Sequence, residues 1–305
     1  MPDIVVLGSL NMDLVARVPR RPTGGETLTG IDFKTINGGK GANQAVAAAR
    51  LGASVAMVGR VGDDVFGGSL LQGLRQDGVD TSCVAVTAGV SSGTALITVD
   101  DRAENSIIII PGANGRLTPT DVDRHQAVIT GARVLMLQLE VPIETVVRAA
   151  QAAKQAGVTV LLDPAPARQL PEELLRSVDI ITPNETEASM LSGRTVGDVR
   201  SAKLAAVDLM SRGIGTVLVK LGARGALLAT GNTFEHVEGF PVHAVDTTAA
   251  GDAFGGALAT GLVEGQSLPQ AVSFANAVGA LATTRFGAQT SMPTRAEVES
   301  FLLNR

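Results

Sequence analysis

The sequence predicts an α/β fold: a doubly wound, mostly parallel sheet flanked by helices, with a second, small β-sheet. Short apolar runs typical of buried strands alternate with alanine- and leucine-rich runs typical of helices, and this alternation favours a parallel sheet covered on both faces. Two further stretches contain strand-like runs with no helix between them, which indicates a separate small sheet. No composition break or long linker divides the chain, so we expect a single domain over residues 1–305.

The expected strands of the large sheet are short apolar runs, as in sheets buried on both faces. They cover residues 4–7, 54–58, 133–137, 158–162, 179–181 and 216–219. The helices expected between and after them cover residues 42–51, 65–76, 143–156, 201–211 and 253–263. A further β-rich run, residues 240–245, leads toward the last of these helices.

The two stretches outside this alternation cover about residues 14–36 and 84–110. Within the second, residues 94–99 and 106–110 form an expected β-hairpin with a polar tip at residues 100–105. Both stretches can pair into the small sheet.

Composition excludes several classes of protein. The formal net charge of −5 argues against a nucleic-acid-binding surface, and the chain has no Trp or Tyr on which bases could stack. No apolar run reaches the length of about 18 residues needed to span a membrane, and the first residues do not resemble a signal peptide. The single cysteine, Cys83, allows no internal disulfide. We therefore expect a cytoplasmic protein without membrane or nucleic-acid partners.

The most informative segment is residues 245–254, where small residues precede the helix expected at 253–263. Backbone N–H groups at a helix start, aided by the helix dipole, form an anion site. Asp252 lies at that start, where a carboxylate beside a bound phosphate can take the proton of an attacking hydroxyl. An isolated Asp there could equally be a helix N-cap. A phosphate site and a base in one turn indicate phosphoryl transfer to an alcohol.

A second glycine-rich segment, residues 37–44, opens the helix expected at 42–51. Its glycines allow a ligand to approach the backbone closely, and Lys40 and Asn43 add donors suited to hydroxyl groups. The segment is not a Walker A loop, because G-x-x-x-x-G-K-[ST] occurs nowhere in the chain. The protein-kinase motifs are absent as well.

Polar residues follow other expected strands. Asn11, Asp13 and Glu140 each come shortly after a strand, which is where open α/β sheets bind ligands. Turns with Asx hydrogen bonds, or a solvated turn carboxylate, would explain the same residues without a ligand. Asp63 and Asp64 look like an acidic metal pair, but we favour a helix cap and first turn for them.

The motifs and their order resemble those of the ribokinase-like carbohydrate kinases over nearly the whole chain. The matching motifs are G-S-L-N-M-D at 8–13, G-K-G-A-N at 39–43, Q-L-E at 138–140, N-E-T-E at 184–187, L-G-A-R-G at 221–225 and R-F-G-A-Q at 285–289. Two positions depart from the family pattern. Ala249 stands where the wider family usually has Gly, and Lys220 stands where a small hydroxyl residue is common.

The resemblance implies phosphorylation of D-ribose at O5 by ATP, giving D-ribose 5-phosphate and ADP. It implies Asp252 as general base and an anion hole formed by Ala249, Ala250, Gly251 and Asp252. The implied sugar-binding residues are Asn11, Met12, Asp13, Gly39, Lys40, Gly41, Ala42, Asn43, Glu140 and Asp252. The implied nucleotide-binding residues are Asn184, Lys220, Leu221, Gly222, Ala223, Arg224, Gly225, Gly251, Asp252 and Asn276.

The same resemblance implies two metal ions and a dimer. An activating K⁺ would be held by Asp246, Thr248, Ala282, Arg285, Gly287 and Ser291, several of them through backbone carbonyls. Glu187 would help hold the water shell of the Mg²⁺ that accompanies ATP. In the family the small sheet forms a lid over the sugar, and we expect a homodimer built from two such lids.

Two alternatives stay open. A related kinase could act on deoxyribose, a nucleoside or a hexose, although Asn11 and Asp13 favour a sugar with all its hydroxyls. A nucleoside would need an apolar or aromatic pocket for its base, for which Phe is the only aromatic residue available. The chain could instead be a sugar-binding regulator without catalysis, against which the intact Gly251 and Asp252 argue.

Overall fold

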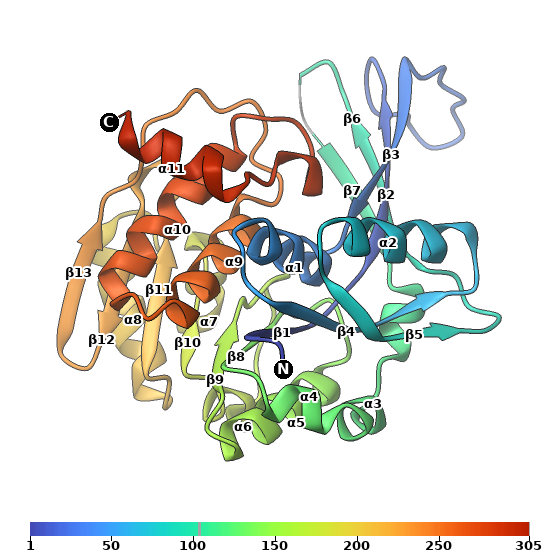
Figure 1. Cartoon of the computed structure of the whole chain (residues 1–305). Coiled ribbons are helices and arrows are strands. Elements are labelled where there is room, and N and C mark those ends of the chain that lie inside the picture. The colour runs from blue at the N-terminus through green and yellow to red at the C-terminus, as the bar shows by residue number, and fades with distance from the viewer. Residues whose placement is uncertain (103–104, 305) are drawn as a thin grey trace.

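A nine-stranded sheet runs through the centre of the computed structural model, which describes residues 1–102 and 105–304 (Figure 1). Its strands are β1 (Ile4–Leu7), β4 (Val55–Gly62), β5 (Asp80–Thr87), β8 (Val134–Leu137), β9 (Thr159–Leu162), β10 (Ile180–Ile181), β11 (Thr216–Lys220), β12 (Ala226–Thr230) and β13 (Thr233–Val237). They lie in the order β13-β12-β11-β10-β9-β8-β1-β4-β5. All neighbours pair in parallel except β11 with β12 and β12 with β13.

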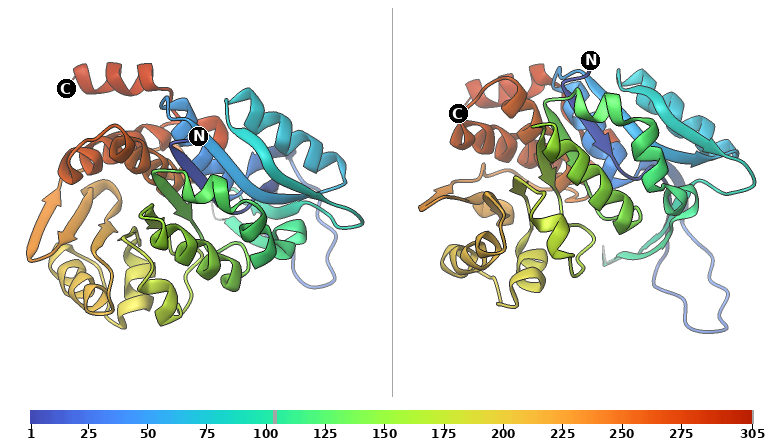
Figure 2. Two further views of the ribbon diagram at one scale, coloured as in Figure 1. Left: turned by 60° about the horizontal axis from the view of Figure 1, so that its bottom comes forward. Right: turned by 90° about the horizontal axis from the view of Figure 1, so that it is seen from below.

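Helices cover both faces of this sheet (Figure 2). One face packs against α3 (Pro119–Arg124), α4 (Gln126–Thr130), α5 (Ile143–Gln155), α6 (Glu172–Leu175), α7 (Glu185–Ser192) and α8 (Val199–Ser211). The other packs against α1 (Lys40–Arg50), α2 (Val65–Gln76), α9 (Ala250–Val263), α10 (Leu268–Ala282) and α11 (Arg295–Leu303). Every residue of β1 and β8 is therefore buried, which explains why these strands are apolar without alternation. No helix within the described residues has the length and apolarity that a membrane span requires.

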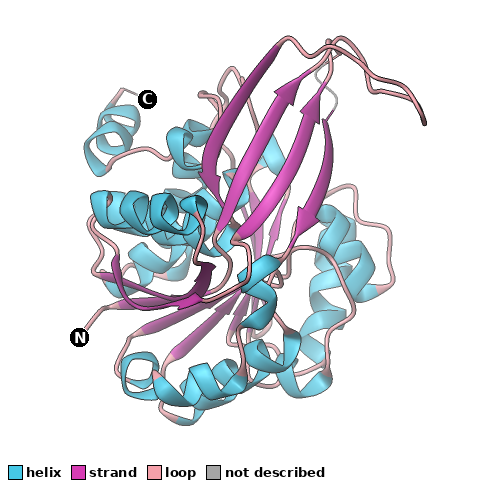
Figure 3. Cartoon of the chain, turned by 90° about the vertical axis from the view of Figure 1, so that its right-hand side faces the viewer, coloured by secondary structure: helices cyan, strands magenta, loops and turns pink. Residues whose placement is uncertain are grey.

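A second sheet of four strands projects from the main body (Figure 3). Its strands are β2 (Asn11–Arg17), β3 (Asp32–Gly38), β6 (Gly93–Val99) and β7 (Asn105–Ile110), in the order β3-β2-β6-β7. Strand β2 pairs in parallel with β6, while β3 and β7 pair antiparallel at the two edges. We call this the small sheet.

The predicted fold class is confirmed, and its strands and helices lie within a few residues of their expected bounds. Two expectations differ. Residues 80–87 form β5, which extends the large sheet beside β4, so the small sheet takes only 93–110 from the stretch expected at 84–110. The β-rich run 240–245 forms a loop, since it contains Pro241, which cannot donate to a ladder. Within the expected polar tip, residues 103 and 104 lie outside the described residues.

The chain order places a ligand crevice at the carboxyl ends of β1 and β8. From β1 the chain proceeds to β4 on one side, and β8 later joins β1 on the other side. Loops that leave two such strands diverge, which opens a crevice between them. Residues 8–11 leave β1 at this place and residues 138–140 leave β8. Three 3₁₀ turns lie in loops: η1 (Gly112–Arg116) follows β7, η2 (Gly222–Arg224) follows β11, and η3 (Gln289–Ser291) follows α10.

Candidate active site

The start of α9 has the geometry of an anion site. Ala249 precedes the helix with φ 58° and ψ 10°, and it is the one residue other than glycine with a positive φ in the described part of the chain. Ala249 and the first helical turn line a large cavity. N–H groups of a first turn have no acceptor within the helix, although Ala250 N–H donates to Thr247 O at 3.3 Å. Gly251 and Asp252 lie in this turn and line the cavity.

Asp252 is buried, with 4% of its surface exposed, and two side chains from α1 donate to it. Asn43 Nδ2 lies 2.9 Å from Oδ2, and Gln44 Nε2 lies 3.4 Å from Oδ1. Burial raises the pKa of Asp252 to about 6, against the lowering effect of Lys40 and with a further rise from Asp163. A carboxylate with a pKa near neutrality is suited to general-base work. Asp252 is not the N-cap of α9. That position is Ala249, and no side-chain cap bond is present at this helix start.

Glu140 joins three chain segments at the carboxyl ends of β1 and β8. Its Oε2 accepts from Ser9 Oγ at 2.5 Å, from Lys40 N at 3.1 Å and from Asn11 Nδ2 at 3.5 Å. The carboxylate thus connects the ends of β1 and β8 with the start of α1. Asn114, in η1, donates from Nδ2 to Asn11 Oδ1 at 2.7 Å and fixes the orientation of that amide. Sequence reasoning missed Asn114, because nothing in its neighbourhood resembles a motif.

Backbone proximity explains the glycines of the segment at 39–43. Gly39 has φ 89°, and a Cβ added there would come within 2.6 Å of Asn11 N. A Cβ on Gly41 would come within 2.7 Å of Ser9 N. The helix start can therefore lie directly on the turn after β1, and Met12 and Ala42 are buried beside this contact.

Three carboxylates, Asp13, Glu140 and Asp252, lie close enough together for their charges to affect the pKa of Asp13. Burial, and then the negative charges of Glu140 and Asp252, raise the pKa of Asp13 to about 7. Lys40 lies among the same groups: burial lowers its pKa, but Asp252, Asp163 and Glu140 outweigh burial and raise it. The ammonium of Lys40 is therefore the main positive charge that balances this cluster.

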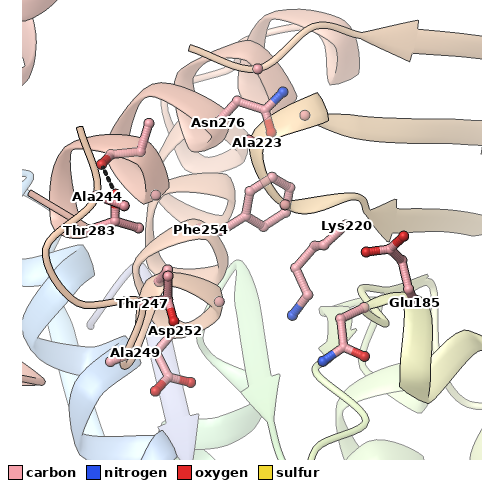
Figure 4. A pocket seen from close by; sticks show the side chains of 18 of the residues that line it. Glu185, Lys220, Ala223, Ala244, Thr247, Ala249, Asp252, Phe254, Asn276 and Thr283 are labelled. Carbon is pink, nitrogen blue, oxygen red and sulfur yellow. Dashed lines mark hydrogen bonds between the residues drawn. The ribbon is translucent and has the colours of Figure 1, made fainter. Parts of the chain in front are cut away.

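A cavity of about 940 Å³ extends from Asp252 along the ends of β10 and β11 (Figure 4). Its lining runs from Asp252 at one end to Ala223 and Asn276 at the other, and it includes Lys40 and Asp163. This volume suits a nucleotide-sized ligand. The structure therefore brings together the start of α9, the charged cluster of Asp13, Lys40 and Glu140, and a large cavity. These parts come from distant stretches of the sequence.

The turn after β11 presents backbone to the cavity. Gly222 and Gly225 have φ 59° and 85°, and a Cβ on Gly225 would come within 2.2 Å of Val237 O. Ala223 lines the cavity beside them. Arg224 instead forms an ion pair with Glu185 and donates to Gly197 O at 2.7 Å, and Leu221 is buried below the turn. Two of the expected nucleotide residues thus support the turn without lining the cavity.

Asn184 and Glu187 form a reciprocal capping box at the start of α7. Asn184 N donates to Glu187 Oε2 at 2.8 Å, and Glu187 N donates to Asn184 Oδ1 at 2.8 Å. Both residues also line the cavity. Burial raises the pKa of Glu187, which Lys220 opposes. Among the described residues, no group of three or more His, Cys, Asp or Glu side chains could hold a metal ion alone.

Asp163 is a cavity residue that the motifs did not reveal. It lies just after β9, is 1% exposed, and accepts from Lys220 Nζ at 2.8 Å. Its place at a strand end is a signal that could have identified it. The two prolines that follow, Pro164 and Pro166, are more typical of a rigid structural turn, and they obscure that signal. By contrast, Asp64 caps α2 as expected, since its Oδ1 accepts from Gly67 N at 2.8 Å.

The segment proposed for a cation forms a closed loop beside the anion turn. Asp246 Oδ1 accepts from Thr248 N at 2.9 Å and Thr248 Oγ1 at 2.7 Å, and Asp246 Oδ2 accepts from Gly287 N at 2.9 Å. Thr283, next to Ala282, accepts at its carbonyl from Val245 N and Asp246 N. The side chains of Arg285 and Ser291 bond elsewhere, to Glu297 and to Ala288 O, so neither side chain takes part in this loop.

Known proteins with similar sequences and folds include several sugar kinases. The model of the pfkB family of carbohydrate kinases matches residues 1–295. A ribokinase of Haemophilus influenzae is 46% identical over 299 residues, which cover 98% of each chain. A deoxyribokinase of Salmonella typhi is 40% identical over 301 residues, again 98% of each chain. The solved structure of Arabidopsis thaliana ribokinase complexed with ribose and ATP matches with a TM-score of 0.94 at 36% identity, covering 99% of this chain and 98% of that one.

The fold and these similarities define an ATP-dependent sugar kinase, a phosphotransferase with an alcohol acceptor. This chain belongs to the pfkB family of carbohydrate kinases.

Proposed function

We propose that this chain transfers the γ-phosphoryl group of ATP to O5 of D-ribose, forming D-ribose 5-phosphate and ADP. The observation that carries the proposal is the position of Asp252. Its carboxylate is buried between the sugar-side amides of α1 and the nucleotide-side cavity, at the first turn of α9. A hydroxyl held against Asn43 and Glu140 would lie between the base and the phosphate to be transferred.

The roles of the side chains follow from their contacts. Glu140, Asn11 and Asp13 surround the crevice with acceptors and donors for sugar hydroxyls. Asn43 Oδ1 is buried and has no hydrogen-bond partner among the described residues, so a sugar hydroxyl would satisfy it. Asp252 accepts the O5 proton as the new bond to phosphorus forms. The N–H groups at 249–252 stabilise the charge on the transferred phosphoryl group.

The nucleotide-side residues fit a Mg²⁺ that arrives with ATP. Glu187 and Asp163 are oxygen ligands of the kind Mg²⁺ prefers, but both oxygens of Glu187 already accept hydrogen bonds from Asn184. Contact through water suits this arrangement better than direct coordination. When bound, Mg²⁺ would neutralise phosphate charge. Asn184 and Glu187 would hold its hydration shell through the fixed capping box.

A coupled assay of ADP release tests the proposal directly. Purified protein with Mg·ATP is offered ribose, deoxyribose, fructose and adenosine at equal concentrations. We expect ribose to give the highest kcat/KM. Deoxyribose is the sharpest comparison, because one related protein is a deoxyribokinase. A preference for deoxyribose would change the assigned substrate, and absence of ADP release with every sugar would favour the non-catalytic alternative.

We further propose that K⁺ binds beside Asp246 and activates the enzyme. Asp246 closes the loop that runs into Ala249, so a cation at the neighbouring carbonyls would fix the anion turn without touching substrate. We expect kcat for ribose to be higher in KCl or CsCl than in NaCl at fixed ionic strength, and Asp246→Ala to lose this difference. Equal rates of the wild type in all three salts would exclude the site.

We propose that the whole chain is one ribokinase-like domain and that the small sheet forms a lid over the sugar. We also propose that the small sheets of two copies form a homodimer. Its edge strand β7 carries four exposed isoleucines, Ile107 to Ile110, and Phe33 on the opposite edge is exposed as well. Pairing with a second copy would cover this apolar edge. Light scattering at micromolar concentration should give the mass of a dimer, and a monomer would contradict the proposal.

Cys83 is buried and unpaired, which supports a reducing, cytoplasmic location.

A further inference from the structure

Lys220 brings a positive charge to the place where the phosphoryl group would lie. It is the last residue of β11, and its side chain extends into the cavity with 14% of its surface exposed (Figure 4). A Cβ added to Gly251 would lie 3.2 Å from Lys220 Nζ, so the ammonium lies beside the first turn of α9.

Asp163 fixes the ammonium in this position. Its Oδ1 accepts from Lys220 Nζ at 2.8 Å, and its Oδ2 accepts from Gln44 Nε2 at 3.3 Å. The same Gln44 Nε2 lies 3.4 Å from Asp252 Oδ1, so Lys220, Asp163, Gln44 and Asp252 form one connected chain. A lysine ammonium has three N–H donors. Within the described residues its one hydrogen bond goes to Asp163, which leaves two donors for a ligand in the cavity.

We propose that Lys220 contacts the γ-phosphoryl group of the bound nucleotide and that Asp163 is the positioning residue for this contact. The inference rests on the proposed phosphoryl transfer. In that step the sugar hydroxyl gives its proton to Asp252 and its oxygen bonds to the γ-phosphorus. The bond from this phosphorus to the bridging oxygen breaks, and its electron pair leaves with ADP. Lys220 exchanges no proton; it donates hydrogen bonds to γ-phosphoryl oxygens in a site partly shielded from water.

Nucleotide titrations of Lys220→Met test which phosphate the ammonium contacts. Calorimetry with Mg²⁺ and either ADP or a non-hydrolysable ATP analogue needs no sugar. We expect the variant to bind the analogue about 10- to 100-fold more weakly than the wild type, the range of a charged hydrogen bond, and to bind ADP within about twofold. Equal weakening for both nucleotides, or no weakening, would overturn the assignment. Lys154→Met is the matched control, because Lys154 pairs with Asp179 on the exposed surface.

A second pair of variants separates catalysis from folding. Lys220→Met leaves the carboxylate of Asp163 buried without its cation, which should lower the melting temperature. Adding Asp163→Asn removes that buried charge, so the double variant should regain most of the melting temperature. It should still show kcat lowered on the order of 10²-fold, as after loss of one charge-stabilising donor. Recovery of wild-type kcat in the double variant would show that Lys220 serves folding alone.

The two proposals can fail separately. If the wild type released no ADP with any sugar, the proposed function would fall. The preference of Lys220 for a triphosphate would still be decided by the titrations, since they contain no sugar. If ribose were phosphorylated at the normal rate by Lys220→Met, the function would stand and the role of Lys220 would be wrong.

Discussion

The two parts of the site, one proposed for the sugar and one for the nucleotide, are built in different ways. The part proposed for the sugar is a network of buried and half-buried side chains, in which Glu140 accepts from Ser9, Asn11 and Lys40. The part proposed for the nucleotide is a cavity of about 940 Å³ whose lining includes Gly222, Ala223, Gly225 and the start of α9, where backbone groups are available. Side chains that are already in place can discriminate among ligands, because an unmatched buried polar group is costly. Backbone donors recognise phosphate with little demand on side-chain identity.

The largest difference between the two sides should appear at their junction, in Asp252→Asn. The variant keeps the shape of the side chain but has no base, and its single amide oxygen can accept from only one of Asn43 and Gln44. We expect kcat to fall about 10²- to 10⁴-fold, the usual effect of losing a general base. Nucleotide affinity, measured by calorimetry, should stay within a few-fold of wild type. A variant with near wild-type kcat would remove the base from the mechanism.

Truncation on the sugar side should affect one ligand only. Glu140→Ala removes a charged acceptor of several hydrogen bonds, so we expect ribose binding to weaken about 10- to 100-fold. Asn43→Ala should act in the same direction. Binding of a non-hydrolysable nucleotide, titrated separately, should change little. Glu144→Ala is the control, since Glu144 is an exposed acid at the start of α5. Equal losses for ribose and nucleotide would abolish the proposed division of the site.

The pH profile should report the raised pKa of the base. Because Asp252 must be ionised to accept a proton and its pKa is about 6, kcat/KM should fall about fivefold between pH 6 and pH 5 and rise toward a plateau above pH 7. Asp13, with a pKa of about 7, should add a second inflection through ribose binding. Asp13→Asn should remove that inflection and leave the one near 6. A rate independent of pH from 5 to 8 would contradict both assignments.

The smallest expected effect concerns backbone strain at Ala249. Its left-handed φ of 58° disfavours any side chain, so Ala249→Gly should raise the free energy of unfolding by up to about 1 kcal/mol. Ala250→Gly is the matched control and should lower it, because Ala250 has helical φ and ψ. Thermal unfolding followed by circular dichroism compares the two variants. A lower melting temperature for Ala249→Gly than for the wild type would show that the Cβ makes a compensating contact.

The sequence alone predicted much of the fold and the site. Apolar runs without alternation predicted strands buried on both faces, and the motif at 245–254 predicted the helix start that carries Asp252. The position of β5 was harder to predict, because residues 80–87 show no feature that distinguishes an edge strand of the large sheet from a strand of the small one. The loop at 240–245 was expected as a β-rich run because its apolar residues resemble a strand, and ladder pairing depends on neighbours distant in sequence.

What the sequence determined by itself is therefore local: which runs are strands, which turns expose N–H groups, and which residue types suit a base or an anion site. Tertiary structure alone decided the partners. It brought Lys220 from β11 to Asp163 after β9, and it linked Asp163 through Gln44 to Asp252, residues that no spacing in the chain connects. The physical reason is that a buried carboxylate is stable only where donors or cations converge on it. That convergence depends on how strands are ordered in the sheet, a property of the packed molecule rather than of any segment.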